Sequence, residues 1–229
     1  MKRIIFYLLL LLLIISCHGI KSEVLRDYIK DVDGNIYNIV KIGKQWWMAE
    51  NLKVTHYRNG DNLPNNSDDD EWDKPLGAWC SYNNDNNNID IFGRLYNWFA
   101  VNDSRGLAPE GWHIPTDEEW ETLVSYLGGS EIAGDKMKVL KAFTDDVHME
   151  INSDEKLVSK SGFSALPGGY RYNHGVFDGI GSNPYFWSST ECSNGTAWYR
   201  YLYDGNSKVY RDNSGWKQAG YSIRCVKDN

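Results

Sequence analysis

WHIPTDEEWETLVSYL, at residues 112–127, is the stretch whose local structure the sequence predicts most fully. Thr116 and Glu119 have the spacing of a capping box, in which a hydroxyl and a carboxylate satisfy backbone N–H groups at a helix start. Apolar residues then recur at the spacing of one helical face, at Trp120, Leu123, Val124 and Leu127. Gly128 and Gly129 follow and are typical of a helix end. The stretch therefore predicts an amphipathic helix, and the rest of the chain must supply the surface that buries its apolar face.

The composition favours a single domain with an aromatic core. The chain has 229 residues, among them 10 Trp, 15 Tyr and 21 Gly, which is enough for one domain with a substantial core. The few Leu and Ala beyond the N-terminus argue against a helical bundle. The formal net charge is −7, or −9 (−7 minus 2) without Lys2 and Arg3. This acidic balance argues against nucleic acid and an anionic membrane surface as partners.

The N-terminus has the pattern of a bacterial lipoprotein signal. A basic pair precedes an apolar run at residues 4–15, which is short for a membrane span. The run ends in Ile-Ile-Ser before Cys17, which is similar to the lipobox whose cysteine is lipidated. We therefore expect residues 1–16 to be a signal peptide, and residues 17–30 to be the lipidated cysteine and a tether. An ordinary signal peptide, or a membrane anchor with a chance cysteine, is the alternative.

This signal predicts both a location and a partner. An exported lipoprotein is attached to a membrane through its acyl chains, and more than one chain gives stable attachment. We expect the outer membrane or the cell surface, with the membrane as a partner through the lipid at Cys17. Residues 31–228 are then the folded domain.

Residues 31–228 have the pattern of an α+β domain rich in antiparallel strands. Strand-like segments are expected at residues 36–42, 45–49, 163–167, 170–172, 185–189, 197–203, 208–211 and 221–226. Gly-containing turns separate them, with Gly168-Gly169 among these turns. Leu95, Trp98 and Phe99 have helical spacing and predict a short second helix, and residues 135–140 predict another turn or two. Residues 144–160 are expected to be irregular.

Three cysteines remain beyond the lipobox: Cys80, Cys192 and Cys225. In an oxidising compartment one pair is expected to form a disulfide, which leaves one thiol over. The residues alone leave three pairings open. A bridge that includes Cys225 is favoured, because it would hold the C-terminal strand.

Acidic and amide side chains raise the question of calcium. Asp31, Asp33 and Asn35 have the spacing of part of a calcium loop, but no Glu completes it, so a plain turn is favoured. The runs at residues 68–71 and 83–88 offer oxygen ligands, although such runs are more often solvated loops. We therefore predict no metal site and no cofactor, with a structural calcium ion as the alternative.

Tyrosines interleaved with arginine form the strongest candidate for a binding surface. The candidate residues are Tyr170, Tyr172, Tyr199, Arg200, Tyr201, Tyr203 and Tyr210, with Arg171 and Arg211 beside them. Tyr and Arg are the residue types that make compact binding surfaces. Strand alternation puts Tyr199, Tyr201 and Tyr203 on the face opposite to Trp198 and Leu202. This row is either an outward contact surface or part of a filled core, and a glycan, a peptide or a surface protein would suit it.

No catalytic site can be assembled from the sequence. The five His have no His-Glu-x-x-His spacing, and Ser188-Ser189-Thr190 lacks the Gly-x-Ser-x-Gly context of a nucleophile. His113, at the start of the capped helix, is expected to be packed or hydrogen-bonded. Nothing joins a nucleophile, a base and an oxyanion donor, so the chain is predicted not to be an enzyme.

Several motifs in order carry a family resemblance. They are DGNIY at 33–37, WMAENL at 47–52, GRLYNW at 93–98, GWHIP at 111–115, GFSALPGGYR at 162–171, FWSSTE at 186–191 and SIRCV at 222–226. Together they resemble the Fibrobacter succinogenes major paralogous domain, over nearly all of residues 31–228. That domain is similar, more distantly, to the C-type-lectin-like fold of formylglycine-generating enzymes, whose Leu-Pro-Thr helix motif resembles residues 114–121. The resemblance implies a few helices packed on twisted antiparallel sheets with long loops.

The resemblance also bears on function and on the cysteines. Many members of the paralogous family carry a Cys where this chain has Ala108, and the resemblance then makes Cys192 the substitute partner of Cys225. The lectin-type Glu-Pro-Asn and Trp-Asn-Asp calcium motifs are absent, and the copper-binding cysteine pair lacks its motif context. We expect an exported, non-enzymatic recognition or structural module. The alternatives are a formylglycine-generating-enzyme-like oxidoreductase and a component of fimbriae or a surface coat.

Overall fold

The computed structural model describes residues 28–143 and 158–228. The predicted signal peptide, Cys17, most of the tether and residues 144–157 lie outside the described residues. Short helices lie among strands up to residue 142, six strands follow one another after that, and the ladders are antiparallel, so the predicted α+β class is confirmed.

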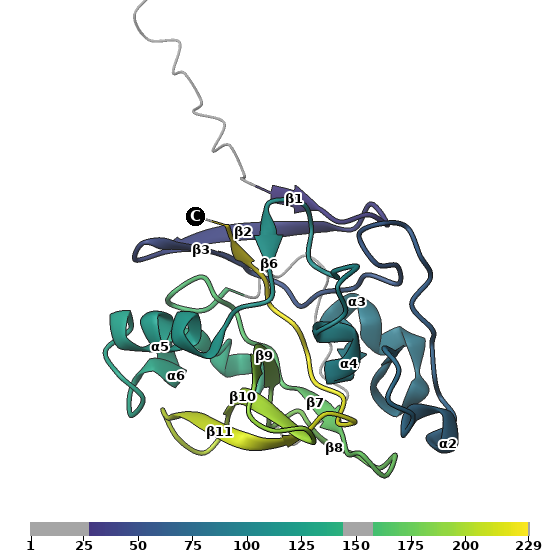
Figure 1. Ribbon diagram of the computed structural model, residues 1–229. Helices are drawn as coiled ribbons and strands as arrows, with labels where there is room; N and C mark the ends of the chain where they lie inside the picture. The colour runs from purple at the N-terminus through teal and green to yellow at the C-terminus, as the bar shows by residue number, and fades with distance from the viewer. Residues whose placement is uncertain (1–27, 144–157, 229) are drawn as a thin grey trace, which may run out of the picture.

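The described chain forms one larger sheet and three smaller ones. The largest has the order β1 (Tyr28–Lys30), β2 (Ile36–Ile42), β3 (Gln45–Met48), β12 (Val226–Lys227) and β6 (Trp112–His113). The second sheet is β11 (Val209–Trp216), β10 (Thr196–Leu202) and β9 (Tyr185–Glu191). The two-stranded sheets are β4 (Trp79–Cys80) with β5 (Leu95–Tyr96), and β7 (Gly168–Arg171) with β8 (Phe177–Ile180). The largest sheet lies at one end of the molecule, and β8, β10 and β11 lie at the opposite end (Figure 1).

Five α-helices and three turns of 3-10 helix stand among the described strands. The α-helices are α2 (Asp69–Trp72), α3 (Ile89–Phe92), α4 (Trp98–Val101), α5 (Asp117–Tyr126) and α6 (Ala133–Met137). The 3-10 turns are η2 (Tyr82–Asn84), η3 (Asn86–Asn88) and η4 (Leu140–Ala142).

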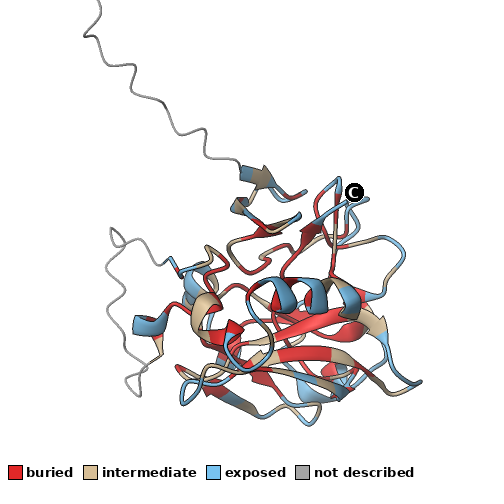
Figure 2. Ribbon diagram, turned by 90° about the vertical axis from the view of Figure 1, so that its left-hand side faces the viewer, coloured by how far each residue is buried: buried red, intermediate tan, exposed pale blue. Residues whose placement is uncertain are grey.

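Helix α5 confirms the prediction from residues 112–127. Both hydrogen bonds of the capping box are present between Thr116 and Glu119. The predicted apolar stripe is buried, and Trp120 packs against the rings of Trp47 at 4.9 Å and Phe186 at 5.6 Å. Figure 2 looks at the side on which α5 lies, where the helix crosses in front of buried strands with its exposed residues outward. The helix therefore joins the first sheet to the second.

The hairpin of β1 and β2 begins the described fold, which shortens the predicted tether. Tyr28–Lys30 was assigned to the tether but pairs with residues 36–38 as β1. The turn between the strands is fixed by Asp31, whose carboxylate accepts the backbone N–H groups of Asp33 and Asn35 and the hydroxyl of Tyr37. The carboxylate oxygens of Asp31 therefore act as hydrogen-bond acceptors that hold the turn.

Several predicted elements differ in their bounds. Gly168-Gly169 is part of β7 and not a turn, and a Cβ on Gly169 would lie 2.6 Å from the carbonyl oxygen of Asp178. The short second helix begins at Trp98, after an Asn97 cap, and Leu95 belongs to a strand. Residues 163–167 and 221–225 form isolated bridges in place of regular strands, and Ser164 has a φ of 56°. For Leu95 and Gly168, pairing with another strand decides the conformation.

The predicted disulfide between Cys192 and Cys225 is not formed. Cys80, Cys192 and Cys225 are all free thiols. Cys225 is buried in the core between β3 and β6, whereas Cys192 is exposed in the turn after β9. The C-terminal segment is held instead by Arg224, which is buried and donates hydrogen bonds to four oxygens.

Candidate functional site

Three tyrosines stand side by side across the second sheet. Tyr201 on β10 is paired with Tyr210 on β11 and with Tyr185 on β9. Their rings are stacked nearly parallel, at 4.6 Å between Tyr201 and Tyr210 and 5.1 Å between Tyr201 and Tyr185, with 8° between the planes in both pairs. All three are partly exposed. We call Tyr185, Tyr201 and Tyr210 the tyrosine row.

The row continues onto the neighbouring hairpin of β7 and β8. The ring of Tyr170 lies 4.2 Å from that of Tyr185, and Tyr172 follows at 4.8 Å from Tyr170. The Tyr170 hydroxyl donates to the hydroxyl of Tyr172 at 2.7 Å. Tyr172 is exposed and stacks on His174 at 5.0 Å. The structure thus brings Tyr170, Tyr172, Tyr201 and Tyr210 of the predicted site together.

Tyr199 departs from the prediction, because it is core. Its side chain is 9% exposed and packs 5.1 Å from the ring of Tyr221. The alternation of β10 places Tyr199 and Tyr201 on one face as expected, but the segment carrying Tyr221 covers the part where Tyr199 lies. Tyr203 is at the other end of the face, beyond β10, and is 45% exposed. The face therefore passes from core at Tyr199 to solvent at Tyr203.

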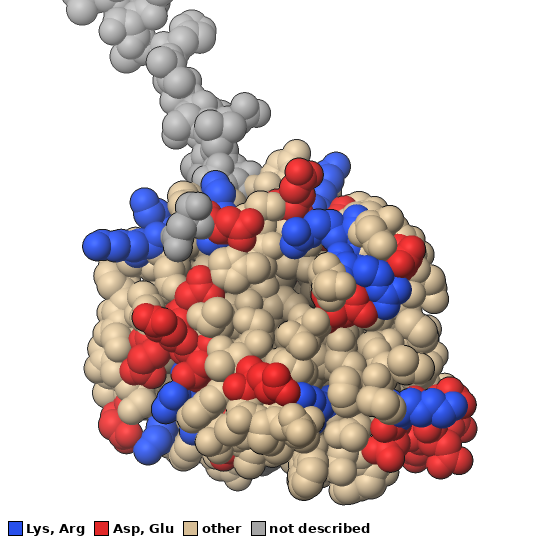
Figure 3. All heavy atoms as spheres, viewed as in Figure 1, with Lys and Arg blue, Asp and Glu red and all other residues tan. Residues whose placement is uncertain are grey.

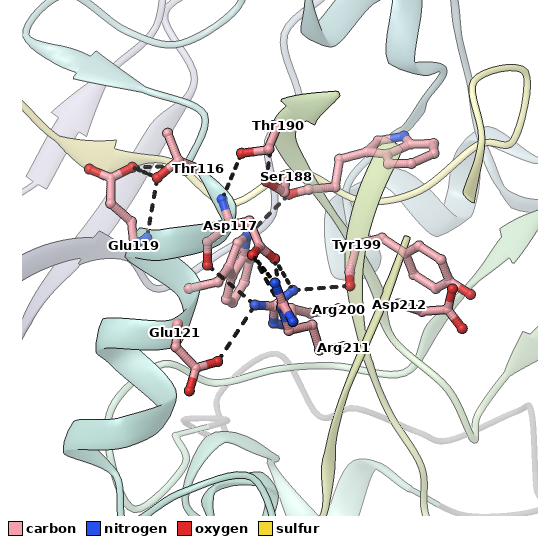
Figure 4. A network of polar contacts seen from close by, with 12 residues as sticks. Thr116, Asp117, Glu119, Glu121, Ser188, Thr190, Tyr199, Arg200, Arg211 and Asp212 are labelled. Carbon is pink, nitrogen blue, oxygen red and sulfur yellow. Dashed lines mark hydrogen bonds and ion pairs between the residues drawn. The ribbon is translucent and has the colours of Figure 1, made fainter. Parts of the chain in front are cut away.

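Arg200 points to the opposite face of β10 and is buried. The prediction that it belongs to an exposed binding surface is therefore wrong. Arg200 is 1% exposed, and its Nη1 donates to the carboxylate of Asp117 at 2.6 Å (Figure 4). Arg211 donates to the same carboxylate at 2.7 Å. Burial alone would raise the pKa of Asp117, but the hydrogen bonds from Arg211 and Arg200 hold it below its ordinary value. This network fixes the start of α5 on the second sheet.

Burial raises the pKa values of three tyrosines at the site, Tyr185, Tyr199 and Tyr201. Burial, followed by the charge of Asp212, raises the pKa of Tyr199 to about 12. Burial also raises the pKa values of Tyr185 and Tyr201, with contributions from neighbouring tyrosines for Tyr185 and from Asp212 for Tyr201. Each phenol can therefore donate and accept a hydrogen bond without carrying charge.

Tyr185 and Tyr221 are the residues of this site that the sequence analysis left out. Tyr185 begins a predicted strand, so its alternation with Phe186 was visible, but its place opposite Tyr201 depends on strand register. The ring of Tyr221 lies 5.1 Å from the ring of Tyr185 and packs against the row. The pairing of β9 with β10 identifies Tyr185, and the bridge of Tyr221 to Tyr96 places Tyr221 beside it.

The other candidate groups serve packing and hydrogen bonding. His113 lies between two carboxylates, with Nδ1 2.6 Å from Asp228 and Nε2 2.8 Å from Glu119. Partial burial opposes its charge, but these hydrogen bonds raise the pKa of His113 above its ordinary value. The Ser188 hydroxyl accepts the backbone N–H of Thr190 at 3.1 Å. Across residues 28–143 and 158–228, no group of three His, Cys, Asp or Glu side chains has the arrangement to hold a metal ion.

The comparisons with known proteins give one match. The profile of the Fibrobacter succinogenes major domain matches residues 40–227. The searches of curated proteins and of solved structures gave no match. Among the described helices, none has the length and apolar character needed to cross a membrane.

Proposed function

Because the chain belongs to the Fibrobacter succinogenes major domain family, we propose that it is a non-enzymatic recognition module of the cell envelope. The proposal rests on the tyrosine row, which is a continuous strip of stacked rings with partly exposed edges. Tyrosine combines a rigid apolar body with a hydroxyl that both donates and accepts, and it loses little entropy on binding. Such a strip suits an extended ligand better than a compact one.

The ligand proposed for this strip is a neutral glycan. A sugar presents hydroxyl groups beside apolar C–H faces, and the phenol groups of Tyr201 and Tyr210 offer the matching hydrogen-bonding groups and ring surfaces. Tyr172 is exposed and adjoins the strip through the buried ring of Tyr170, and Tyr203 is exposed just beyond the end of β10. Figure 3 shows charged side chains toward both corners of the lower part of the molecule, with mostly uncharged side chains along the bottom edge between them. The strip itself has a charged neighbour, because Lys208 lies over the ring of Tyr210 at 5.4 Å.

Export and lipid attachment at Cys17 are part of the same proposal. They are supported by the lipobox-like run before Cys17 and by the position of β1, where the described chain begins. The strand β1 lies at the end of the molecule away from β10 and β11 (Figure 1). A protein attached through Cys17 would then turn its tyrosine row away from the membrane and toward soluble or wall-bound ligands.

A C-type-lectin-like architecture is proposed for the fold. It is supported by the order of the capped helix α5, the curled antiparallel sheets and a C-terminal strand β12 that pairs beside β3 in the first sheet. The absence of the lectin calcium motifs from the sequence means that the proposed glycan binding does not require calcium.

A glycan array probed with the detergent-solubilised full chain tests the function. We expect binding that is unchanged by removal of calcium with a chelator, and that is lost in Tyr201→Ser. Tyr126→Ser is the matched control, because Tyr126 is 65% exposed and lies on α5, outside the row. Tyr199 is unsuitable for this test because its loss would damage the core. An array with no signal would refute the glycan ligand and favour a protein partner.

A further inference from the structure

The connection between β10 and β11, residues 203–208, carries one end of the proposed glycan site. It begins with Tyr203, which is 45% exposed. Within it, the side-chain amide of Asn206 donates to the hydroxyl of Tyr210 at 3.1 Å. At its end, Lys208 lies over the ring of Tyr210 at 5.4 Å. The conformation of this connection therefore decides where Tyr203 lies and what surrounds Tyr210 in the tyrosine row.

A buried lysine holds the backbone of the connection. Lys138 follows α6, and its side chain is 1% exposed. Its ammonium donates to the carbonyl oxygens of Asn206 at 2.6 Å and Tyr203 at 2.8 Å, with a longer bond of 3.5 Å to that of Asp204. The carboxylate of Asp135 lies 3.6 Å away and compensates the charge. An ammonium has three N–H donors and no acceptor, so it suits converging carbonyl oxygens.

Helix α6 contacts the same connection at two further points. The backbone N–H of Gly134 donates to the carbonyl oxygen of Ser207 at 2.8 Å, and the Ser207 hydroxyl donates to the carboxylate of Asp135 at 2.6 Å. A Cβ on Gly134 would lie 2.6 Å from the carbonyl oxygen of Ser207, so glycine permits an approach that a larger residue would prevent. We call Gly134, Asp135 and Lys138 the turn clamp.

The clamp replaces order that the connection cannot supply by itself. Residues 203–208 form a longer link than the two-residue turns that fix a tight hairpin. Surface loops of this kind are mobile unless contacts hold them. A buried ammonium is costly unless it is hydrogen-bonded, and an apolar side chain in its place would leave the carbonyl oxygens without donors. The position of Lys138 therefore links the order of the connection to α6.

We infer that the turn clamp is a positioning element of the glycan site, with Lys138 as its central positioning residue. This inference rests on the proposed function. The clamp does not touch the ligand; it keeps Tyr203 and Asn206 in the arrangement that completes the tyrosine row at Tyr210. The glycan then meets a site that is already formed, and binding does not have to order the connection.

Binding of neutral hexasaccharides to the detergent-solubilised full chain tests the clamp. The probes are maltohexaose, cellohexaose and N-acetylated chitohexaose, measured by calorimetry. If the connection without Lys138 is ordered in about one fifth of the molecules, the apparent dissociation constant of Lys138→Ala rises about fivefold. Lys136→Ala is the matched control, because Lys136 also lies on α6 but donates to the carbonyl oxygen of Leu127 at 2.7 Å, away from the connection. Its constant should equal that of the wild type, and an equal loss in both variants would overturn the inference.

Chemical rescue separates positioning from packing. In Lys138→Ala, added n-propylammonium can place an ammonium among the same carbonyl oxygens and should restore most of the affinity. Tetramethylammonium has no N–H donor and should restore none. Affinity that stays weak with n-propylammonium, or that returns equally with tetramethylammonium, would overturn the inference.

Ser207→Ala keeps the test decisive if Lys138→Ala does not fold. It removes the hydrogen bond to Asp135 from a partly exposed position, and it should weaken binding about twofold while the protein stays folded. A wild-type constant in Ser207→Ala, or in a folded Lys138→Ala, would overturn the inference alone. If the wild type bound none of the three hexasaccharides, the proposed glycan function would be refuted and the inference with it.

Discussion

Replacing Arg224 with Met should unfold the protein at a much lower temperature. Arg224 is 1% exposed, and its guanidinium donates to Asn51 Oδ1 at 2.6 Å, Met48 O at 3.1 Å, Ser164 O at 2.9 Å and Phe163 O. Burial lowers its pKa to about 9, so the group is still charged at neutral pH. It joins β3 to the segment that carries Phe163 and Ser164, and these two parts of the chain are far apart in sequence.

The expected loss follows from the four acceptors. Met fills much of the volume of Arg224 but donates no hydrogen bond, so four buried oxygens lose their donor. At about 1 kcal/mol for each, the lower end of the usual penalty, the free energy of unfolding falls by about 4 kcal/mol. For a domain of this size, that corresponds to a decrease in Tm of about 8–16 °C.

Urea unfolding followed by tryptophan fluorescence measures the loss. The midpoint should fall with little change in the slope. Arg58→Met is the matched control, because Arg58 also donates to two carbonyl oxygens but is exposed, so water can replace it. We expect the control to lose less than about 1 kcal/mol. If Arg224→Met lost no more than Arg58→Met, the account of the C-terminal segment would be refuted.

Three further predictions concern single side chains. Thr116→Ala removes the cap of α5 and should lower the free energy of unfolding by about 1 kcal/mol. Thr122→Ala, on the exposed side of the same helix, should not lower it. Thermal unfolding of the two variants measures the difference. The raised pKa of His113 means that its stabilisation is complete below its unfolded pKa of about 6.5 and is lost as the pH rises through the folded pKa. The difference in unfolding free energy between the wild type and His113→Gln should therefore shrink from pH 5 to pH 9, and a constant difference would contradict this. Cys192 should react with a thiol reagent in the native protein, whereas Cys80, whose pKa burial raises to about 12, should react only after unfolding.

The sequence predicted those parts of the structure that depend on neighbouring residues. Helix α5 has its cap, its first turn and its apolar stripe within a dozen positions, so the pattern is complete in one stretch. The turn at Asp31 is local for the same reason. Gly168-Gly169 has the composition of a turn, but pairing with β8 makes it a strand, and that pairing has no local signal.

The tyrosine site shows the same limit. Alternation in β10 correctly put Tyr199 and Tyr201 on one face. It did not show that Tyr221, from a segment outside this sheet, covers Tyr199. Nor did it show that Tyr185 on β9 stands opposite Tyr201, because register between strands depends on the whole sheet. The predicted disulfide between Cys192 and Cys225 was wrong for a similar reason. Cys225 is buried and Cys192 is exposed, and nothing in the local sequence shows this difference.

The dissociation constant of a glycan selected on the array tests the recognition role most directly. It should be measured for the full chain, for Tyr201→Ser and for Tyr126→Ser, with each protein shown to be folded. The row at Tyr201 predicts at least about a tenfold weaker constant in Tyr201→Ser, about 1.4 kcal/mol, and an unchanged one in Tyr126→Ser. Equal constants in the two variants, or no glycan bound by the wild type, would contradict it.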